Sequence, residues 1–347
     1  MEVHDTSERI RASSVLFNAV SRYGDIKFHK NVTRETLVKL ITKPIYRPMR
    51  KKIRGKTRLL HVPSKELKIL LKNILNVILY DFAISKVAHG GVLKRSIVTN
   101  AEAHIDSRSF FEIDFRNYFP SITIKMVIDC LVNLFEKRLQ FGFLENCGLI
   151  SFREARGLAK IIGRLATCNG ILPQGAPTSP YLQNLILYDL DEKLCEFSQR
   201  HGLVYTRFID DMIFSSRESY ILRETRCGIM QFIKAEVGHF LKFNRTKIHY
   251  RRGKKRVPII TGVTIVESKN GVLSLSLPQE QIDRYRNVIN LASYGLASEE
   301  QVWGVMGLVK MIFKKVPQEL RNPFMKFLEN CYPDSWDRKL DLWRDWL

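Results

Sequence analysis

The sequence predicts a mixed α/β protein with a strand-rich centre and helical material at both ends. Apolar residues recur at roughly helical spacing over residues 7–42 and again from Gln279 onward. Between these stretches, short runs of β-type residues alternate with helical patterns and turn residues, as in "FFEIDFRNYFP" at 110–120. At 347 residues the chain is long enough for two or three subdomains around a substantial core.

In the first half of the chain, residues that cap helices or end strands indicate where the elements begin and end. Ser64 precedes a dense apolar run and is placed to cap a mostly buried helix. Pro120 limits the preceding strand, which ends near Asp114. The predicted elements are a helical stretch at 7–42, a basic loop around Gly55, a strand at 56–64, a helix over the apolar run 67–82, a strand ending near 114 and a helix at 123–135.

The second half contains a hairpin pattern with acids at its tip. Ser179 is predicted to be the N-cap of a helix with Pro180 at its first position, and this helix stops before Gly202. Two short apolar runs then flank Asp210 and Asp211. The predicted elements are a helix at 179–201, strands at 203–209 and 212–215, a helix at 217–240, a basic hairpin at 248–266, a strand at 271–278 and helices beyond 279.

Composition excludes several classes of protein. No stretch approaches the roughly 20 apolar residues that a membrane span needs, and the N-terminus lacks the features of a signal peptide. The six cysteines are scattered without CxxC spacing, so neither a zinc site nor a redox pair is indicated. We therefore expect a soluble cytoplasmic protein without a membrane partner.

The net charge of +21 favours a polyanionic partner, either nucleic acid or an acidic membrane surface. The basic residues cluster at 47–58 and 249–258, and aromatic residues are interleaved with them. This pattern suits contact with a phosphate backbone together with base stacking. A basic surface that serves only solubility is the alternative.

Asp114, Asp210 and Asp211 each follow an apolar, strand-like segment. Carboxylates that leave strand ends side by side repel one another and become tolerable when divalent cations neutralise them. Mg²⁺ binds carboxylates together with water and substrate phosphates, and two such ions can support phosphoryl transfer. An isolated Asp-Asp pair is weak evidence, because most such pairs lie in ordinary turns.

The neighbouring segments sharpen this interpretation. "DFRNYFPSI" (114–122), "GILPQGAPTSPYLQN" (170–184) and "FIDD" (208–211) resemble, in order, palm motifs A, B and C of reverse transcriptases, and "NRTKIHY" (244–250) resembles motif D. The resemblance covers about residues 40–270. It implies a right-hand polymerase fold with fingers, a palm of antiparallel sheet with packed helices, and a helical thumb.

Two more segments resemble retron reverse transcriptases, the polymerases of bacterial anti-phage systems. "NAEAH" (100–104) matches their NAxxH motif and "ITGV" (260–263) is similar to their VTG motif. Two departures occur, since Phe208 stands where motif C usually has tyrosine and Ile260 replaces valine. Neither departure removes an expected metal ligand, so activity is still expected.

The resemblance implies roles for particular residues. Asp114, Asp210 and Asp211 would be catalytic and would hold two Mg²⁺ ions, with Asp211 the less direct ligand. Phe119 would lie under the sugar of the nucleotide and exclude a 2′-OH, and Lys247 would protonate the leaving pyrophosphate. The expected nucleotide-binding residues are Lys56, Arg58, Phe115, Phe119, Gln174, Gly175 and Lys247. The expected RNA-binding residues are Asn100, His104, Arg251, Arg252, Lys254 and Lys255.

The alternatives are a core aromatic at Phe119, a phosphate-backbone contact or a solvated side chain at Lys56, a surface lysine at Lys247, and turn-capping side chains at Asn100 and His104. The predicted division is an N-terminal helical extension at 1–40, fingers at 41–110, a palm at 111–275, and a thumb and RNA-binding region at 276–347. Within the palm range, residues 125–170 are expected to contribute to the fingers.

The predicted function is RNA-directed DNA synthesis. The enzyme would copy a structured noncoding RNA, primed from a 2′-OH of that RNA, with dNTPs as substrates and branched RNA–DNA as product in phage defence. A separate effector protein is implied. The alternatives are another bacterial defence or intron-type reverse transcriptase, or an inactive polymerase fold that only binds RNA.

Overall fold

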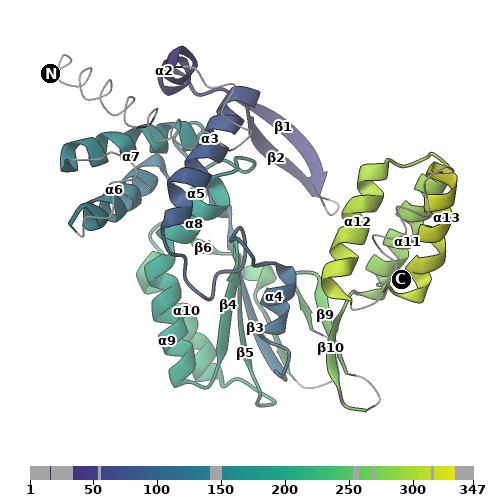
Figure 1. Ribbon diagram of the computed structural model, residues 1–347. Helices are drawn as coiled ribbons and strands as arrows, with labels where there is room; N and C mark the ends of the chain where they lie inside the picture. Colours follow the sequence, from purple (N-terminus) through teal and green to yellow (C-terminus); the bar gives the residue numbers. More distant parts are fainter. Residues whose placement is uncertain are drawn as a thin grey trace.

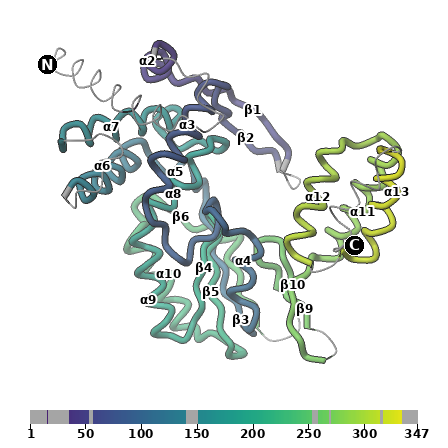
Figure 2. Tube along the Cα trace, viewed as in Figure 1, coloured from purple at the N-terminus to yellow at the C-terminus, as the bar shows by residue number. Residues whose placement is uncertain are grey.

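The computed structural model describes residue 16 and residues 34–53, 56–140, 151–252, 258–267, 270–313 and 316–332. Figure 1 shows a central sheet flanked by helices, a long hairpin of β1 and β2, and a group of C-terminal helices. The tube in Figure 2 follows the same path in sequence colours, from the purple N-terminal elements to the yellow α13.

The elements up to the motif B segment are mostly helical. They are α2 Arg34–Thr42, β1 Tyr46–Ile53, β2 Lys56–Pro63, α3 Lys65–Val77, the 3₁₀ turn η2 Leu79–Asp81, α4 Ile97–Glu102, β3 Ser109–Arg116, α5 Tyr118–Ser121, α6 Ile124–Gln140 and α7 Phe152–Ala166.

The remaining elements complete the sheets and the C-terminal helices. They are α8 Ser179–Ile186, α9 Tyr188–Arg200, β4 Val204–Phe208, β5 Asp211–Ser216, α10 Arg223–Val237, β6 Lys242–Phe243, the 3₁₀ turn η4 Arg245–Lys247, β7 His249–Arg252, β8 Ile259–Ile260, β9 Val263–Glu267, β10 Leu273–Ser276, α11 Gln279–Ser293, α12 Glu299–Ile312 and α13 Gln318–Cys331.

The central sheet is antiparallel, and β3 lies at its middle. Within the described residues it has five strands in the order β4–β5–β3–β6, with β7 also paired to β3. β3 and β5 pair so that Asp114 lies opposite Asp211, and β4 and β5 form the predicted hairpin. The mixed fold with an antiparallel palm sheet is therefore confirmed.

The two faces of this sheet bury different material because side chains alternate along a strand. Phe111, Ile113 and Phe115 of β3 join the main core, which also contains residues from α3 and α6 to α10. Phe110 of β3 joins a smaller cluster with Ala101 of α4 and residues of β8 and β9. Asp114 shares the alternation of Phe110, so it lies on the face away from the main core.

The sequence prediction was wrong about the basic segment before Gly55. Residues 46–53 form β1, which pairs along its whole length with β2, where a loop was expected. Pro48 is compatible with this strand because β1 is paired on one side within the described hairpin, and proline is tolerated at sheet edges.

The helix predictions were right in kind and less accurate at the ends. Ser64 caps α3 as expected, since its side chain accepts a hydrogen bond from the Leu67 amide. The helix expected over 179–201 is interrupted at Leu187, its N-cap is Thr178 and not Ser179, and α9 begins at Tyr188. The helix expected over 217–240 is shorter, at Arg223–Val237.

The basic hairpin expected over 248–266 is not one ladder. β7 extends the central sheet by pairing with β3, whereas β8 pairs with β9 and β9 with β10. Local sequence pattern does not specify which distant strand a short strand joins, and this explains the error.

The C-terminal helices α11, α12 and α13 have a core of their own, with Ile289, Met306 and Phe324 among its fully buried residues. Residues 1–15, 17–33 and 333–347, which include most of the predicted N-terminal extension, lie outside the described residues. The predicted division of the chain into fingers, palm and thumb stays a prediction. Among the helices that the structure describes, none is long and apolar enough to cross a membrane.

Candidate active site

Three aspartates meet at one end of the central sheet. Asp114 lies on β3 directly opposite Asp211, the first residue of β5. Phe208 also pairs with Asp211, so Ile209 and Asp210 form a two-residue turn between β4 and β5. Asp114 is 4% exposed, and the other two aspartates are half-buried. The hairpin tip thus brings all three predicted carboxylates to one place.

The carboxylates perturb one another in the way expected of closely spaced like charges. Burial, followed by the charges of Asp210 and Asp114, raises the pKa of Asp211 to about 7. Burial and the charge of Asp114 also raise the pKa of Asp210. The arrangement therefore concentrates negative charge that needs a cationic partner.

Lys247 supplies a positive charge to this group of carboxylates, and Asn244 supplies a hydrogen bond. The Lys247 ammonium forms an ion pair with Asp114, and Asn244 Nδ2 donates to Asp114 Oδ1 at 2.9 Å. Burial lowers the pKa of Lys247, but its hydrogen bond and attraction to Asp114 outweigh that effect and raise it overall. The motif D segment is therefore attached directly to the motif A carboxylate.

The donor set fits hard divalent cations. Three carboxylates supply oxygen ligands, which Mg²⁺ prefers, and their mutual repulsion favours a bound cation. In the described part of the chain, no three Asp, Glu, His or Cys side chains are grouped tightly enough to enclose a metal ion as they stand. The Asp114 carboxylate is instead ion-paired with the Lys247 ammonium. Asp114, Asp210 and Asp211 are the residues that would hold metal.

The expected nucleotide-binding residues of the fingers side lie in and beside β2. Arg58 is exposed on β2, and its charge partly opposes the rise in the pKa of Asp210, which places it within electrostatic reach of the carboxylates. Lys56 begins β2, and its side chain lies outside the described residues. The Gln174 carbonyl accepts a hydrogen bond from the His61 amide at 2.9 Å, joining the motif B turn to β2.

Gly175 has a structural reason to be glycine. Its φ is +122°, in the region that favours glycine, and an added Cβ would lie 3.2 Å from the His61 carbonyl oxygen. The prediction that Gln174 and Gly175 keep a thin backbone beside the nucleotide is compatible with this geometry.

Phe119 and Phe115 differ in what they can contact. Phe119 is half-buried and packs edge-on against Tyr118, with ring centroids 5.6 Å apart. Phe115 is 3% exposed and stacks against Phe243 at 5.8 Å. The position of Phe115 therefore does not support the predicted contact between its side chain and a nucleotide. Because side chains alternate along β3, the Phe115 side chain points into the main core.

Asn100 and His104 are both fully buried, so their positions do not support direct contact with RNA. His104 Nε2 bonds Thr206 Oγ1 at 2.7 Å, and its Nδ1 bonds Ser215 Oγ at 2.6 Å. Asn100 Nδ2 donates to Thr261 Oγ1 at 3.4 Å. The "NAEAH" and "ITGV" segments therefore meet each other and tie α4 to the sheet.

The basic residues of the 249–258 cluster have different surroundings. Arg251 forms an ion pair with Glu112 at 2.8 Å, and Arg252 is exposed on β7. Lys254 and Lys255 lie outside the described residues. Arg252 is thus the member of this set that is seen open to a partner.

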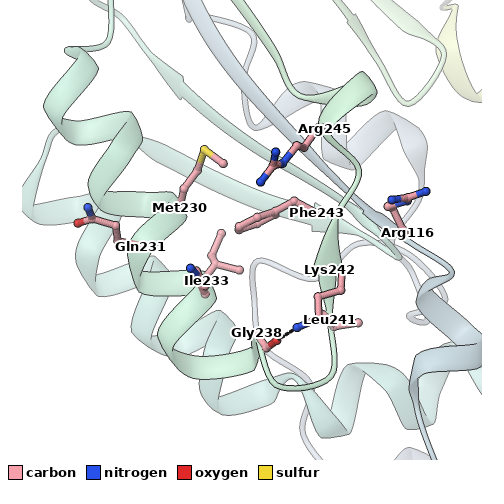
Figure 3. Close-up of a pocket in the computed structure, with 10 residues that line it drawn as sticks. Arg116, Met230, Gln231, Ile233, Gly238, Leu241, Lys242, Phe243 and Arg245 are labelled. Atoms are coloured by element: carbon pink, nitrogen blue, oxygen red, sulfur yellow. Dashed lines mark hydrogen bonds between the residues drawn. The ribbon is translucent and has the colours of Figure 1, made fainter.

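A hollow of about 570 Å³ lies beside the motif A and motif D strands, between α10 and β6. Figure 3 shows Phe243 and Ile233 among the residues that line it, with Arg245 above the Phe243 ring and Arg116 to its right. Sequence patterns gave no indication of this hollow, because its apolar residues come from two separate elements.

Sequence patterns also gave no indication of the buried ion pair next to the Ile209–Asp210 turn. Arg207 and Asp191 form a fully buried ion pair at 2.6 Å directly beneath it. Arg207 precedes Asp210 by three residues, but nothing in the sequence shows that its side chain points into the core. Asn244 was missed as a partner of Asp114 for a similar reason, since the two are joined only by the fold.

An antiparallel sheet that brings three carboxylates together at a hairpin turn is the arrangement expected for the class of nucleic acid polymerases. A family model described as reverse transcriptase (RNA-dependent DNA polymerase) matches residues 49–265. The chain belongs to the reverse transcriptase family.

The curated relatives confirm the resemblance to retron enzymes. The chain is 31% identical to the retron Mx65 reverse transcriptase of Myxococcus xanthus over 74% of this chain and 59% of that protein. It is 28% identical to the retron Ec86 reverse transcriptase of Escherichia coli over 80% of this chain and 78% of that protein. The match therefore spans less than two thirds of the Mx65 protein.

Among solved structures, apo telomerase from Candida tropicalis gives a TM-score of 0.47 at 11% identity, covering 82% of this chain and 60% of that chain. This likeness is too distant to bear on the function.

Proposed function

We propose that this protein is an RNA-directed DNA polymerase that extends a primer by divalent-metal-dependent nucleotidyl transfer. The observation that carries the proposal is the meeting of Asp114, Asp210 and Asp211 at one end of the sheet. Membership of the reverse transcriptase family supports it.

The chain's own residues have distinct tasks in this mechanism. Asp114, Asp210 and Asp211 would hold two Mg²⁺ ions. When bound, such a pair activates the attacking hydroxyl and offsets charge on the leaving oxygen. Arg58, together with Lys56, would bind the triphosphate, and positive charge there stabilises the transferring phosphate.

The remaining groups would select the nucleotide and complete the reaction. Phe119 would exclude a ribose 2′-OH, and Gln174 with Gly175 would leave room for the template and nucleotide. Lys247 would move from the Asp114 carboxylate to donate a proton to the leaving pyrophosphate. Its ion pair places it within reach of the site before substrate binds.

The partner would be a structured noncoding RNA that serves as template and, through a 2′-OH, as primer. The relatives are named as retron reverse transcriptases, and the charge of +21 suits a phosphate backbone. Arg251, Arg252, Lys254 and Lys255 would contribute to binding it. The branched RNA–DNA product would act in the cytoplasm, in phage defence together with a separate effector protein.

The test compares wild type with a chain that carries both Asp210→Ala and Asp211→Ala. We expect the double variant to lose DNA synthesis and to keep its affinity for RNA, because the change removes metal ligands and leaves the basic surface intact. DNA synthesis by the double variant would refute the metal assignment. A wild type that binds RNA and makes no DNA would favour the RNA-binding alternative.

A second experiment tests the retron assignment. The chain is expressed with its flanking DNA, and nucleic acid is extracted and treated with ribonuclease and with debranching enzyme. A short DNA joined to RNA through a 2′ linkage is expected. DNA made only from free 3′ primers would favour an intron-type or other defence enzyme.

A further inference from the structure

Arg207 has an unusual environment for a basic residue in a chain of charge +21. It lies on β4, is 0% exposed, and faces the main core beside Tyr205. Its partner Asp191, on α9, is also 0% exposed. A buried ion pair is weak evidence for a role in stability, because apolar residues of similar volume often serve stability as well.

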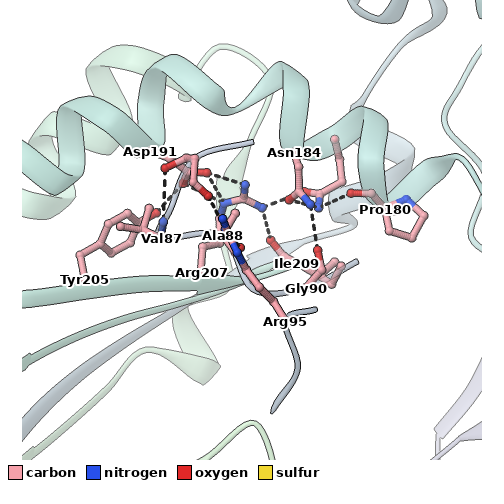
Figure 4. Close-up of polar contacts among 12 residues, drawn as sticks. Val87, Ala88, Gly90, Arg95, Pro180, Asn184, Asp191, Tyr205, Arg207 and Ile209 are labelled. Carbon is pink, nitrogen blue, oxygen red and sulfur yellow. Dashed lines mark hydrogen bonds and ion pairs between the residues drawn. The ribbon is translucent and has the colours of Figure 1, made fainter. Parts of the chain in front are cut away.

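The Arg207 guanidinium joins Asp191 to the Ile209 carbonyl and to Gln183. Nε donates to Asp191 Oδ1 at 2.9 Å and Nη2 to Asp191 Oδ2 at 2.6 Å, which fixes the plane of the group. Nη1 then donates to the Ile209 carbonyl at 3.0 Å and to Gln183 Oε1 at 2.9 Å. Figure 4 shows Arg207 lying between Asp191 on one side and Ile209 on the other.

The two-residue turn of Ile209 and Asp210, called the catalytic turn under the proposed function, includes one residue that needs such support, Ile209. Its φ is +60°, a conformation that β-branched residues rarely adopt. Such a residue persists only where its surroundings hold it there. The carbonyl that Arg207 binds belongs to the peptide that leads directly into Asp210.

A second contact to the turn comes from residues 87–90, which lie outside the named strands. The 87–90 segment runs alongside β4, with hydrogen bonds from the Arg207 amide to Val87 and from the His89 amide to Arg207. Gly90 approaches the turn so closely that an added Cβ would lie 2.6 Å from the Ile209 nitrogen. Asn184 Nδ2 holds the Gly90 carbonyl at 2.8 Å.

The Arg207 contacts also reach the nucleotide side of the site. Gln183 Oε1, which accepts from Arg207, accepts a hydrogen bond from the Tyr118 hydroxyl as well. Tyr118 directly precedes Phe119, the predicted sugar-selecting residue. One guanidinium therefore links α9, the motif B helix α8, the motif A segment and the motif C turn.

We propose that Arg207 is a positioning residue that holds the Ile209–Asp210 peptide and thereby sets the carboxylates of the catalytic turn. This inference rests on the proposed function and adds to it a specific device for placing Asp210 and Asp211. It assigns the arginine of "RFIDD" a task distinct from that of the two aspartates after it.

The test uses the full chain and three variants, Arg207→Lys, Asp191→Asn and Arg207→Lys with Ile209→Gly. Lysine keeps a charge for Asp191 but lacks the planar fork that reaches Ile209 at the same time. We expect Arg207→Lys to lower kcat about 100-fold, the size of effect that a misplacement of about 1 Å produces. The KM for dNTP and the affinity for RNA should change little.

The other two variants separate positioning from stability. Asp191→Asn removes the charge pair and leaves the guanidinium bond to Ile209, so thermal stability should fall more than kcat. Glycine at 209 adopts positive φ without the side-chain penalty, so Ile209→Gly should restore part of the kcat lost in Arg207→Lys. If kcat follows thermal stability in all variants, or if glycine gives no rescue, the positioning role is refuted.

Two further measurements keep the outcome decisive. If Arg207→Lys does not fold, Arg207→Met with Asp191→Leu removes both charges together and should fold with low kcat. Wild-type kcat in that folded pair would refute the proposal. Absence of DNA synthesis by wild type would instead refute the proposed function, and the two failures are thus distinguishable.

Discussion

Because His104 is buried in an uncharged form, it should make the free energy of unfolding decrease as the pH falls. A single substitution of this histidine should remove that dependence. Burial, and to a smaller extent the charge of His89, lowers the pKa of His104 to about 3. Its ring is held neutral between Thr206 and Ser215. We therefore predict that His104→Gln flattens the dependence of unfolding free energy on pH below pH 6.5.

The sign and size of the effect follow from proton binding. The unfolded chain takes up a proton at His104 as pH falls through about 6.5, whereas the folded chain does not until about pH 3. The unfolded state binds more protons in this window, so stability is present above pH 6.5 and is lost as pH falls. Between pH 7 and pH 5 the loss from His104 amounts to about 2 kcal/mol.

Glutamine has no titration in this range, so His104→Gln should lack that loss. The variant should also lose about 1 kcal/mol at every pH, because its amide pairs less well with the two hydroxyls. The assay is urea unfolding at intervals of pH from 7 to 5, comparing slopes between wild type and variant. His239→Gln, which changes an exposed histidine on the α10 side of the palm, is the matched control. Equal slopes in wild type and His104→Gln would refute the reasoning.

Three more predictions concern the site and its partner. Phe119→Ala should relax discrimination against ribonucleotides, measured as the ratio of dNTP to rNTP incorporation, and an unchanged ratio would remove its sugar-selecting role. Affinity for RNA should fall steeply with salt, and a flat plot of log affinity against log salt would count against phosphate contacts. Gly90→Ala should lower kcat at least about 10-fold, because even small displacements of the catalytic turn are costly. Its control Gly228→Ala, whose Cβ would meet only Phe197 at 3.5 Å, should keep kcat and gain about 0.5–1 kcal/mol of stability.

The parts of the site that sequence predicted are those in which local pattern and chemistry agree. Two short apolar runs on either side of the aspartates predicted the β4–β5 hairpin, which the structure contains. The pairing of β5 with β3 places Asp211 opposite Asp114. Ser64 was identified as a cap because the capping bond is local. In each case the information lies within a few residues of the feature.

The parts that sequence did not predict depend on distant partners. β1 was taken for a loop because its charges and Pro48 hid a strand that exists through pairing with β2. β7 was assigned to the wrong ladder, since its partner β3 lies far away along the chain. Asn100 and His104 were expected at an RNA surface, and the fold buries them between α4 and the sheet.

Arg207 shows why sequence motifs identify candidate catalytic residues more readily than the residues that position them. The two aspartates of "RFIDD" are conspicuous because carboxylates in an apolar run demand an explanation. An arginine in a strongly basic chain needs no special explanation. Its burial on β4 can be explained only when the structure shows Asp191 as its ion-pair partner. Candidate metal ligands can thus be inferred from the free-energy cost of burying their charges without a partner. The proposed positioning residue can be inferred only from the contacts that offset the cost of burying its own charge, and those contacts join parts of the chain that the fold alone brings together.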